Sequence, residues 1–332
     1  MIRFGIAGFG LHAVRRLMPG FSLAQNSKVV ALSRRDLIQG RAAAAQYGIP
    51  HVFASTEELV RCPEVDAVLV TTPNARHLED VLTAVAAGKP VLCEKPMGMD
   101  ADECRQMVEA AQKAGVLLGV AQIFRFEEST LRFQERIAAG DIGRPVLARS
   151  EFSYPGSGHA RTWLYNRAIS GGGPIADVGV HCIDALRYIL QDEPRQVSAL
   201  GYSDQSSGDV EASAVVTLKF QRGTLATVLV STRAHYRTPL EIVGDLGVLR
   251  ADDAFSVERP LKLELWRNGN CVAEETVSNR LAYAKQVDAF ASAAEGGEAF
   301  PVPGLEGWRN QIILDAAYRS LAGGRLQATS NQ

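Results

Sequence analysis

Short apolar runs alternate with segments of helical periodicity over the first 120 residues of the chain. Runs of Val, Ile, Leu and Ala predict buried strands, because strands of a parallel sheet are covered on both faces. Such strands are expected at residues 2–7, 29–33, 66–71, 91–93 and 116–121. Strands that alternate with helices form a doubly wound parallel sheet, so the pattern predicts an α/β domain of the Rossmann type.

Helix-capping and helix-breaking residues between these strands predict where individual helices begin and end. Pro19 and Gly20 are expected to stop a first helix that starts near residue 11. Gly48 is expected to cap an alanine-rich helix in the left-handed conformation. Asp100 is expected to begin a helix that runs to residue 114.

The pattern changes after about residue 122, where strand-like segments rich in Val, Thr and Leu are separated by turns. Such a succession predicts an α+β domain with an open, largely antiparallel sheet. Its strands are expected at 146–154, 196–202, 212–220, 224–232, 240–243 and 261–266, and helices at 127–139, 174–190, 282–294 and 307–321.

The predicted domain organisation is therefore a nucleotide-binding domain over residues 1–122 and a substrate-binding and oligomerisation domain over residues 123–332. Helices are expected to cover one face of the second sheet. The other face then needs water or a partner chain, so we expect a homodimer or homotetramer that forms through this sheet.

Composition narrows the class of partner. The 332 residues carry a formal net charge of -2 without a block of like charge, which gives no electrostatic reason to expect nucleic acid or an anionic membrane as a partner. The five cysteines are scattered and form no C-x-x-C pair, so we expect reduced thiols and no metal site. There is no signal-peptide pattern and no run of 18 apolar residues, so a cytoplasmic protein with a small-molecule substrate is expected.

The first predicted strand leads into the pattern G-x-G-x-x-A, from Gly8 to Ala13, and then into a helix. In this setting the first glycine permits a tight turn, the second lets a pyrophosphate approach the backbone, and the helix N-terminus offers free N–H groups. The alternative is a glycine turn that binds nothing. The residues expected to contact the dinucleotide here are Gly8, Phe9, Gly10, Leu11 and His12.

The end of the second strand predicts which dinucleotide is bound. A carboxylate is usual there in NAD-binding proteins, whereas this strand ends in Ser33-Arg34-Arg35. A hydroxyl and guanidinium groups suit a 2′-phosphate, so NADP(H) is favoured over NAD(H). Two alternatives stay open: Asp36 takes the acidic role, or both arginines are solvated surface charges.

Lys95 follows the strand at residues 91–93, at the edge where parallel sheets hold their ligands. A lysine there points toward the nicotinamide, and Pro96 makes a cis peptide bond possible. A surface lysine is the alternative.

The candidate partner lies after three glycines, Gly171 to Gly173, that give a flexible approach. Asp177 and His181 follow at positions i and i+4 of one helix, which places an acid and a base on one face. His181 is the candidate general acid or base, and Asp177 either orients the imidazole or binds a substrate hydroxyl. Asp184, one turn further, holds the helix in place. The alternative is a helix whose Asp and His pair only with each other.

These motifs together resemble the glucose-fructose oxidoreductase, inositol dehydrogenase and MocA (Gfo/Idh/MocA) family of NAD(P)-dependent oxidoreductases. The resemblance spans nearly the whole chain and rests on the glycine pattern, the strand from Val65 that leads to Thr71-Thr-Pro-Asn74 and His77, Glu94-Lys-Pro96, Gly143-Arg-Pro145 and the segment from Gly171 to Asp184. It implies Lys95, Asp177 and His181 as catalytic residues, and a cofactor site that includes Thr71, Thr72, Pro73, Asn74, His77, Glu94 and Lys95.

The resemblance also implies a substrate, namely a sugar, a polyol or a related small molecule that carries a secondary hydroxyl or carbonyl. Arg161, Trp163 and Tyr165 are candidate substrate contacts, although a solvent-facing lid has the same composition. Many members have an arginine after the tryptophan, whereas Leu164 follows Trp163 here, and Arg161 or Arg167 is the candidate replacement. Two other functions stay open: a non-catalytic dinucleotide sensor, and a glycosidase that uses transient redox chemistry.

Overall fold

The computed structural model describes residues 1–156 and 161–329. Contacts divide the chain into two compact units. The first unit comprises Met1–Gln122 and Tyr283–Gln311, and the second comprises Ile123–Ala282 and Ile312–Gln332. The segment 283–311, which we assigned to the second domain from the sequence, thus packs with the first unit.

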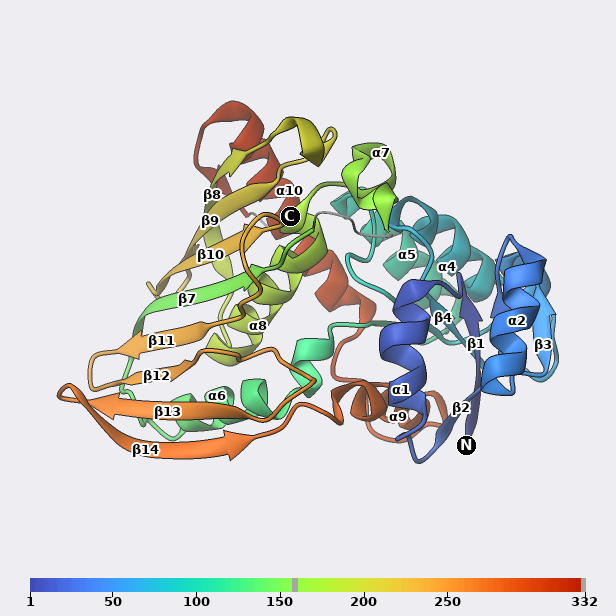
Figure 1. The fold of residues 1–332 in the computed structure, drawn as a ribbon, viewed down its shortest axis with the longest axis horizontal. Helices are drawn as coiled ribbons and strands as arrows, with labels where there is room; N and C mark the ends of the chain where they lie inside the picture. The colour runs from blue at the N-terminus through green and yellow to red at the C-terminus, as the bar shows by residue number, and fades with distance from the viewer. Residues whose placement is uncertain (157–160, 330–332) are drawn as a thin grey trace. The chain divides into compact units, whose positions relative to one another are not determined.

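The first unit contains a parallel six-stranded sheet in the order β3-β2-β1-β4-β5-β6 (Figure 1). Its order reverses between β1 and β4, which is the switch point where doubly wound sheets bind ligands. The predicted Rossmann architecture is confirmed. The strands are β1 (Ile2–Ala7), β2 (Ser27–Ser33), β3 (His51–Phe53), β4 (Ala67–Val70), β5 (Val91–Cys93) and β6 (Leu118–Val120).

The helices between these strands confirm most of the predicted caps. Gly48 ends α2 with φ 66°, and the Asp100 side chain accepts from the Glu103 amide at 2.9 Å to begin α5. The helices are α2 (Leu37–Tyr47), α3 (Thr56–Leu59), α4 (His77–Ala86) and α5 (Ala101–Ala114).

The first helix departs from its prediction, because it does not stop at Pro19. A π-helical turn, η1 (Ala13–Leu17), continues into α1 (Met18–Phe21). Pro19 lies in the first turn of α1, where the missing N–H costs little. Gly20 serves packing rather than termination, since a Cβ there would lie 2.5 Å from Tyr283 Cβ.

Helix α9 (Ala282–Ala294) belongs with the first sheet because of an aromatic cluster. Phe4 of β1 lies between Phe21 and Phe290, with ring centroids 5.4 and 6.0 Å away, and Phe290 packs on Phe300 at 5.3 Å. Phe4 and Phe290 are fully buried. Burial of this apolar area, about 25 cal/mol per Å², is what attaches a segment distant in sequence to the first core.

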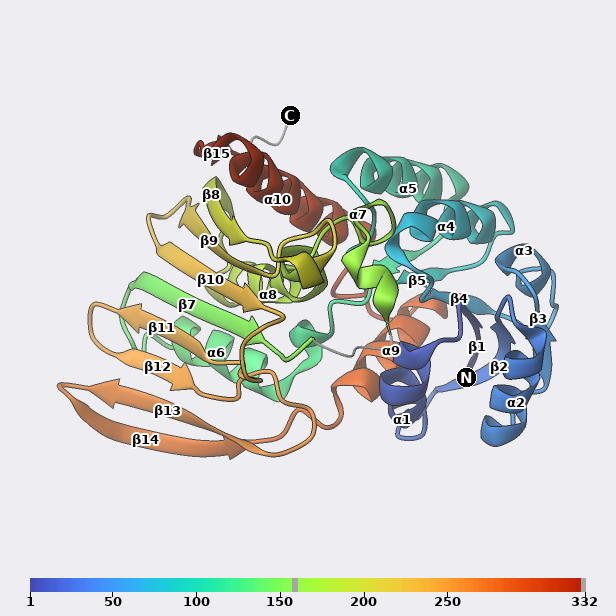
Figure 2. The ribbon, with the colours of Figure 1, turned by 45° about the horizontal axis from the view of Figure 1, so that its top comes forward.

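The second unit contains a nine-stranded sheet in the order β14-β13-β12-β11-β7-β10-β9-β8-β15 (Figure 2). All neighbours are antiparallel except β7 and β10, which confirms the predicted class. The strands are β7 (Pro145–Ser153), β8 (Pro194–Tyr202), β9 (Ser213–Phe220), β10 (Leu225–Ser231), β11 (Leu240–Gly244), β12 (Val248–Ala251), β13 (Leu261–Arg267), β14 (Asn270–Val277) and β15 (Gln327–Ala328).

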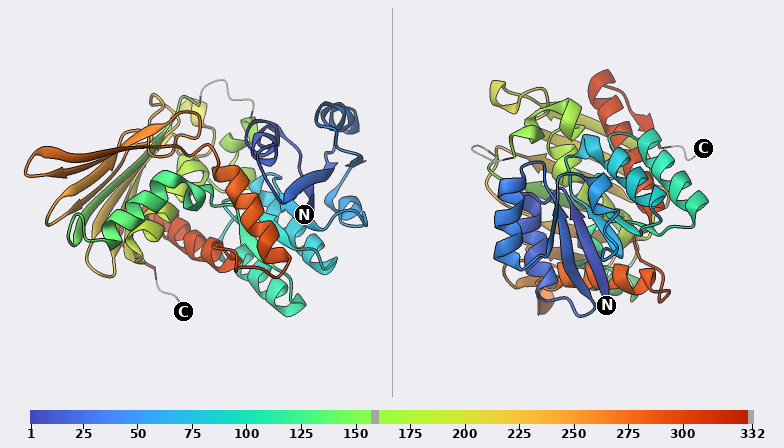
Figure 3. Two further views of the ribbon diagram at one scale, coloured as in Figure 1. Left: turned by 90° about the horizontal axis from the view of Figure 1, so that it is seen from below. Right: turned by 90° about the vertical axis from the view of Figure 1, so that its right-hand side faces the viewer.

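Helices lie on one face of this sheet, and the opposite face carries no helix of the described residues (Figure 3, left). The helical segments that belong to this unit wholly or in part are η3 (Ile123–Phe126), α6 (Glu128–Ala138), η4 (Thr162–Tyr165), α7 (Arg167–Ser170), η5 (Ile175–Gly179), α8 (Val180–Leu190), η6 (Gln205–Ser207) and α10 (Gly304–Gly323). Among the described helices, none has both the length and the apolar character needed to cross a membrane.

Candidate functional site

The loop after β1 has the geometry of a phosphate-binding turn. Gly8 has φ +83°, and a Cβ there would lie 2.6 Å from Thr72 Cγ2, so only glycine fits. A Cβ at Gly10 would have only the Gly8 carbonyl oxygen within 4 Å, at 3.7 Å. The space beside Gly10 is therefore open to a ligand. The Phe9 ring is buried, and its centroid lies 6.0 Å from that of Tyr47. Phe9 therefore offers a ligand mainly its backbone.

The end of β2 is tied to the same loop. The Gly8 amide donates to Ser33 Oγ at 3.3 Å, and Arg34 Nη1 donates to the Phe9 carbonyl at 3.2 Å. Arg35 is exposed. Asp36 instead caps α2: its Oδ1 accepts from the Ile38 and Gln39 amides at 3.0 and 3.1 Å, and the Gln39 amide contact lowers its pKa. The carboxylate of Asp36 is thus engaged by the helix.

The loop after β4 is held by two threonines and a buried histidine. Thr71 Oγ1 donates to the Gly8 carbonyl at 2.8 Å, and Thr72 Oγ1 donates to Asp80 Oδ2 at 2.7 Å. Both His77 ring nitrogens meet backbone carbonyls, Nδ1 that of Pro96 at 3.0 Å and Nε2 that of Thr72 at 2.9 Å. Burial lowers the pKa of His77. His77 therefore joins the loops after β4 and β5, while Pro73 and the buried Asn74 lie between these contacts.

Lys95 is half-buried directly after β5, and its peptide bond to Pro96 is cis. The preceding Glu94 is 8% exposed and pairs with His12, whose Nε2 lies 2.9 Å from Glu94 Oε1. Burial alone would raise the pKa of Glu94, but the charges of His12 and Lys95 outweigh burial, and the pKa is lowered. Glu94 is therefore an ionised carboxylate beside the candidate nicotinamide end of the site.

In the second unit, Asp177 and His181 are both buried and lie where the π-helical turn η5 passes into α8. π-Turns inside helices are frequent at functional sites. Tyr154 donates its hydroxyl to Asp177 Oδ2 at 2.6 Å, and Arg161 Nη1 lies 3.9 Å from Asp177 Oδ1. The His181 ring stacks on Phe124 with centroids 4.4 Å apart. Asp177 is thus held as an acceptor, and the plane of the imidazole is fixed.

The glycines before this helix are needed for close packing, which corrects the expected flexible approach. A Cβ at Gly172 would overlap the Tyr318 hydroxyl, and one at Gly173 would overlap the Glu211 carbonyl. The buried Glu211 carboxylate accepts from the amides of Gly173 and Ile175 at 3.1 and 2.9 Å, and from the Tyr318 hydroxyl at 3.0 Å. An anion at the start of a helix is stabilised by the helix dipole.

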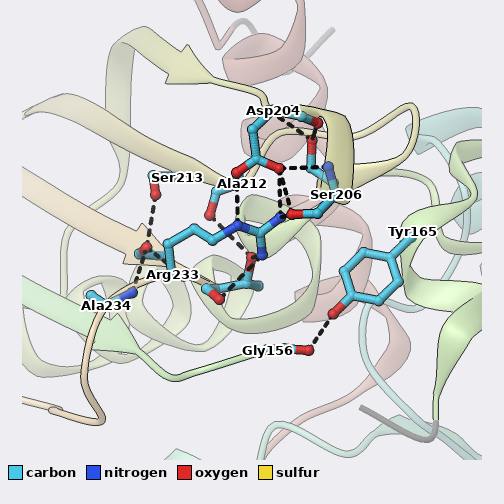
Figure 4. A network of polar contacts seen from close by, with 11 residues as sticks. Gly156, Tyr165, Asp204, Ser206, Ala212, Ser213, Arg233 and Ala234 are labelled. Atoms are coloured by element: carbon cyan, nitrogen blue, oxygen red, sulfur yellow. Dashed lines mark hydrogen bonds and ion pairs between the residues drawn. The ribbon is translucent and has the colours of Figure 1, made fainter. Parts of the chain in front are cut away.

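A small cavity opens beside Asp177. Tyr165 lines it and donates its hydroxyl to the Gly156 carbonyl, as Figure 4 shows. Arg233, the residue after the lining Thr232, binds Asp204 through two nitrogens at 2.8 and 2.9 Å (Figure 4). Trp163 is half-buried and is not among the lining residues. The lining residues are Tyr154, Leu164, Tyr165, Gly173, Pro174, Asp177, Val210, Glu211 and Thr232.

Sequence reasoning missed Tyr154 and Glu211. Tyr154 follows β7 directly, and a tyrosine at the end of a strand carries no motif. Glu211 lies in the turn before β9, where a carboxylate is ordinary. Their roles arise from contacts 23 and 38 residues away in the chain, to Asp177 and Gly173. Among the described residues, no three His, Cys, Asp or Glu side chains are grouped so that they could hold a metal.

Comparison with known proteins places both units in one family. Residues 2–122 match the model of the oxidoreductase family with an NAD-binding Rossmann fold, and residues 130–250 match the GFO/IDH/MocA C-terminal domain. The chain is 34% identical over 298 residues to 1,5-anhydro-D-fructose reductase of Ensifer adhaerens, with 89% of each chain covered. It is 30% identical to D-xylose 1-dehydrogenase (NADP(+)) 2 of Haloferax volcanii, with 96% of each chain covered.

Among solved structures, aldose-aldose oxidoreductase from Caulobacter crescentus, complexed with glycerol, has the same fold. Its TM-score is 0.90 at 26% identity, and the match covers 98% of this chain and 99% of that one. The fold and the site therefore define an NAD(P)-dependent oxidoreductase that acts on CH–OH groups. The chain belongs to the Gfo/Idh/MocA family.

Proposed function

We propose that the protein is an NADP(H)-preferring oxidoreductase that interconverts a secondary alcohol and a ketone on a sugar, polyol or related small molecule. The observation that carries the proposal is the buried pair of Asp177 and His181 on one π-to-α segment, with Asp177 held by Tyr154. Names of relatives support the substrate class, since two that match at 30% identity or more act on an anhydro-sugar and on xylose.

The residues after β1, β2, β4 and β5 fit a dinucleotide, because Gly10 leaves the backbone of the first loop open. When bound, the nicotinamide supplies hydride transfer at its C4. Lys95 is proposed to donate a hydrogen bond to the substrate oxygen and to stabilise negative charge that develops there. His181 is proposed to give that oxygen a proton in reduction and to remove it in oxidation.

Asp177 is proposed to position the substrate. Because Tyr154 donates to one of its oxygens, the carboxylate has a fixed orientation and accepts from a substrate hydroxyl rather than exchanging a proton. Tyr165 and Thr232 shape the wall of the adjoining cavity. Arg161 is proposed to contact the substrate as well, because its Nη1 lies 3.9 Å from Asp177 Oδ1.

The function is tested with a panel of sugars, inositols and keto-sugars, followed at the NADPH absorbance band with NADH in parallel. We expect turnover of at least one keto-sugar or polyol. A protein that binds the dinucleotide but turns over none of them would instead be a sensor. Hydrolysis of a glycoside without net NADPH change would assign it to the glycosidase class.

The preference for NADP(H) is proposed on the contacts at the end of β2. Ser33 and Arg34 contact the phosphate loop, while the Asp36 carboxylate caps α2. Changing Arg34 to Asp should weaken NADPH binding by about 10–100-fold, the value of one or two charge-assisted hydrogen bonds, and should improve NADH binding. The ratio of kcat/KM for the two cofactors measures this. A wild-type protein that strongly prefers NADH would contradict it.

The open face of the second sheet is proposed to join copies of this chain. Its exposed apolar side chains include Leu147, Leu200 and Leu225, which are 49%, 76% and 50% exposed. Leu225 faces Leu147 across the parallel pair of β10 and β7, so a continuous apolar patch results. Leu225→Asp should shift a dimer or tetramer to smaller species in sedimentation velocity. Leu246→Asp, 66% exposed in the loop between β11 and β12, is the control. A wild-type monomer would contradict the proposal.

A further inference from the structure

We propose that His12 and Glu94 form a positioning pair, in which the histidine of the phosphate loop donates a hydrogen bond to the carboxylate next to Lys95 and orients it. The pair would couple dinucleotide binding to the placement of the Lys95 loop. The inference rests on the proposed function only where it assigns Lys95 to the reacting end. The His12–Glu94 contact itself belongs to the candidate dinucleotide site and does not depend on the reaction.

The two side chains come from loops that are not neighbours. His12 follows the glycines after β1, and Glu94 follows β5, while β4 lies between these strands in the sheet. Their contact, Nε2 to Oε1 at 2.9 Å, therefore bridges over the carboxyl end of β4. Both side chains are largely shielded, with 28% of His12 and 11% of Glu94 exposed. A bridge at this edge lies where parallel sheets bind their ligands.

The second oxygen of Glu94 extends the bridge to Lys95. The Lys95 amide donates to Glu94 Oε2 at 3.2 Å. One carboxylate is thus shared between the imidazole of the phosphate loop and the backbone of the candidate catalytic lysine. Because the carboxylate is ionised, it only accepts, and the proton of His12 in this contact is on Nε2. The edge of the His12 ring also packs against Tyr283, with centroids 6.3 Å apart, which restrains the ring.

Electrostatics explains why such a carboxylate needs a partner. A dinucleotide brings a pyrophosphate to the loop that carries His12, and a buried carboxylate nearby would repel it. His12 stabilises that carboxylate by donating a hydrogen bond to it at 2.9 Å. Removing His12 alone would leave Glu94 ionised, buried and less well paired. Removing the carboxylate charge as well would take away the repulsion, so the second substitution is expected to repair the first.

The chain contains a matched pair at a different place. His51 Nε2 lies 2.9 Å from Glu64 Oε1, the same atoms at the same distance as in the candidate pair. His51 belongs to the edge strand β3, and its side chain and that of Glu64 are 32% and 51% exposed. A solvent-exposed ion pair of this kind contributes little to stability. His51→Asn therefore controls for the loss of a histidine–glutamate contact as such.

The test measures dissociation constants of NADPH and NADH by isothermal titration for His12→Asn, Glu94→Gln, the double variant and His51→Asn. We expect His12→Asn to weaken NADPH binding about tenfold, as for loss of one charge-assisted contact in a shielded site. The double variant should bind within about threefold of the wild type, because the effects of residues in direct contact are coupled and do not simply add. His51→Asn should bind like the wild type.

Additive weakening in the double variant, or wild-type affinity in His12→Asn, would overturn the proposal. If His12→Asn does not fold, His12→Gln takes its place in the test. The longer glutamine side chain keeps an N–H donor that can reach Glu94, so this variant is expected to retain most of the affinity for NADPH. In the kinetic readout, Glu94→Gln should lower kcat more than it raises KM for the sugar, because the Lys95 loop loses an anchor. The binding cycle needs no substrate. If the four variants show the expected affinities but the protein turns over no substrate, the result contradicts the proposed function and still supports the His12–Glu94 pair.

Discussion

Replacing Lys95 by Met or His181 by Asn is expected to lower kcat about 10²–10⁴-fold, the usual contribution of a positioned acid–base group. The affinity for NADPH should change little, because neither side chain is proposed to hold the dinucleotide's phosphates. Steady-state rates with a keto-sugar, together with titration of the cofactor, measure both effects.

Two controls separate chemistry from general damage. Lys89 lies just before β5, and its Nζ donates to the Val65 carbonyl at 2.6 Å, at the opposite end of the strand that Lys95 follows. Lys89→Met and His51→Asn should keep near-wild-type kcat. A variant that lacks both Lys95 and His181 should have nearly the same kcat as the slower of the two single variants. The reason is that the effects of removing groups that act together on one step do not add. Near-normal turnover in that variant would exclude both assignments.

Asp184→Asn is expected to lower the free energy of unfolding by about 3–5 kcal/mol, which is typical when one partner of a buried ion pair is removed. Asp184 accepts from Arg125 Nε and Nη2 at 2.9 and 2.7 Å, and only 1% and 7% of the two side chains are exposed. Arg187 Nη1 lies 3.6 Å from the same carboxylate. Loss of the aspartate charge would leave the buried Arg125 guanidinium poorly compensated, whereas Arg187 keeps its contacts with Glu193 at 2.7 and 2.6 Å.

This pair connects η3, which contains Arg125, to α8, where Asp184 lies one turn beyond His181. The stability is measured by urea titration with tryptophan fluorescence. Arg105→Ala, which breaks an exposed pair with Glu109 on α5, should cost below about 1 kcal/mol. A loss for Asp184→Asn as small as that of Arg105→Ala would show that the buried pair does not hold the helix.

The alternation of apolar runs predicted both sheets because burial on two faces and burial on one face leave different periods in the sequence. Strand β5 and helices α5 and α9 were predicted at their observed bounds. The short strand β12 was not predicted, nor was β14, where half of the side chains are polar and most positions are exposed. The continuation of the first helix past Pro19 was missed because a π-turn shifts the hydrogen-bond register.

The site residues that belong to motifs of consecutive residues could be predicted from the sequence. The glycine loop, Ser33-Arg34-Arg35, Lys95 and the pair Asp177 and His181 stand in motifs with a local setting. The groups that hold them were not predictable, because Tyr154 reaches Asp177, Glu211 reaches Gly173 and His12 reaches Glu94 only after folding. The packing of the segment from 283 to 311 on the first unit is long-range in the same way.

The most direct test of the account is a crystal structure of the protein with NADPH and a polyol product. The account predicts Lys95 Nζ and His181 Nε2 within about 3.2 Å of one substrate oxygen, the range of a hydrogen bond, with the carbon that bears it next to the nicotinamide. A complex in which the two groups contact different oxygens, or in which either one faces away from the substrate, would contradict it.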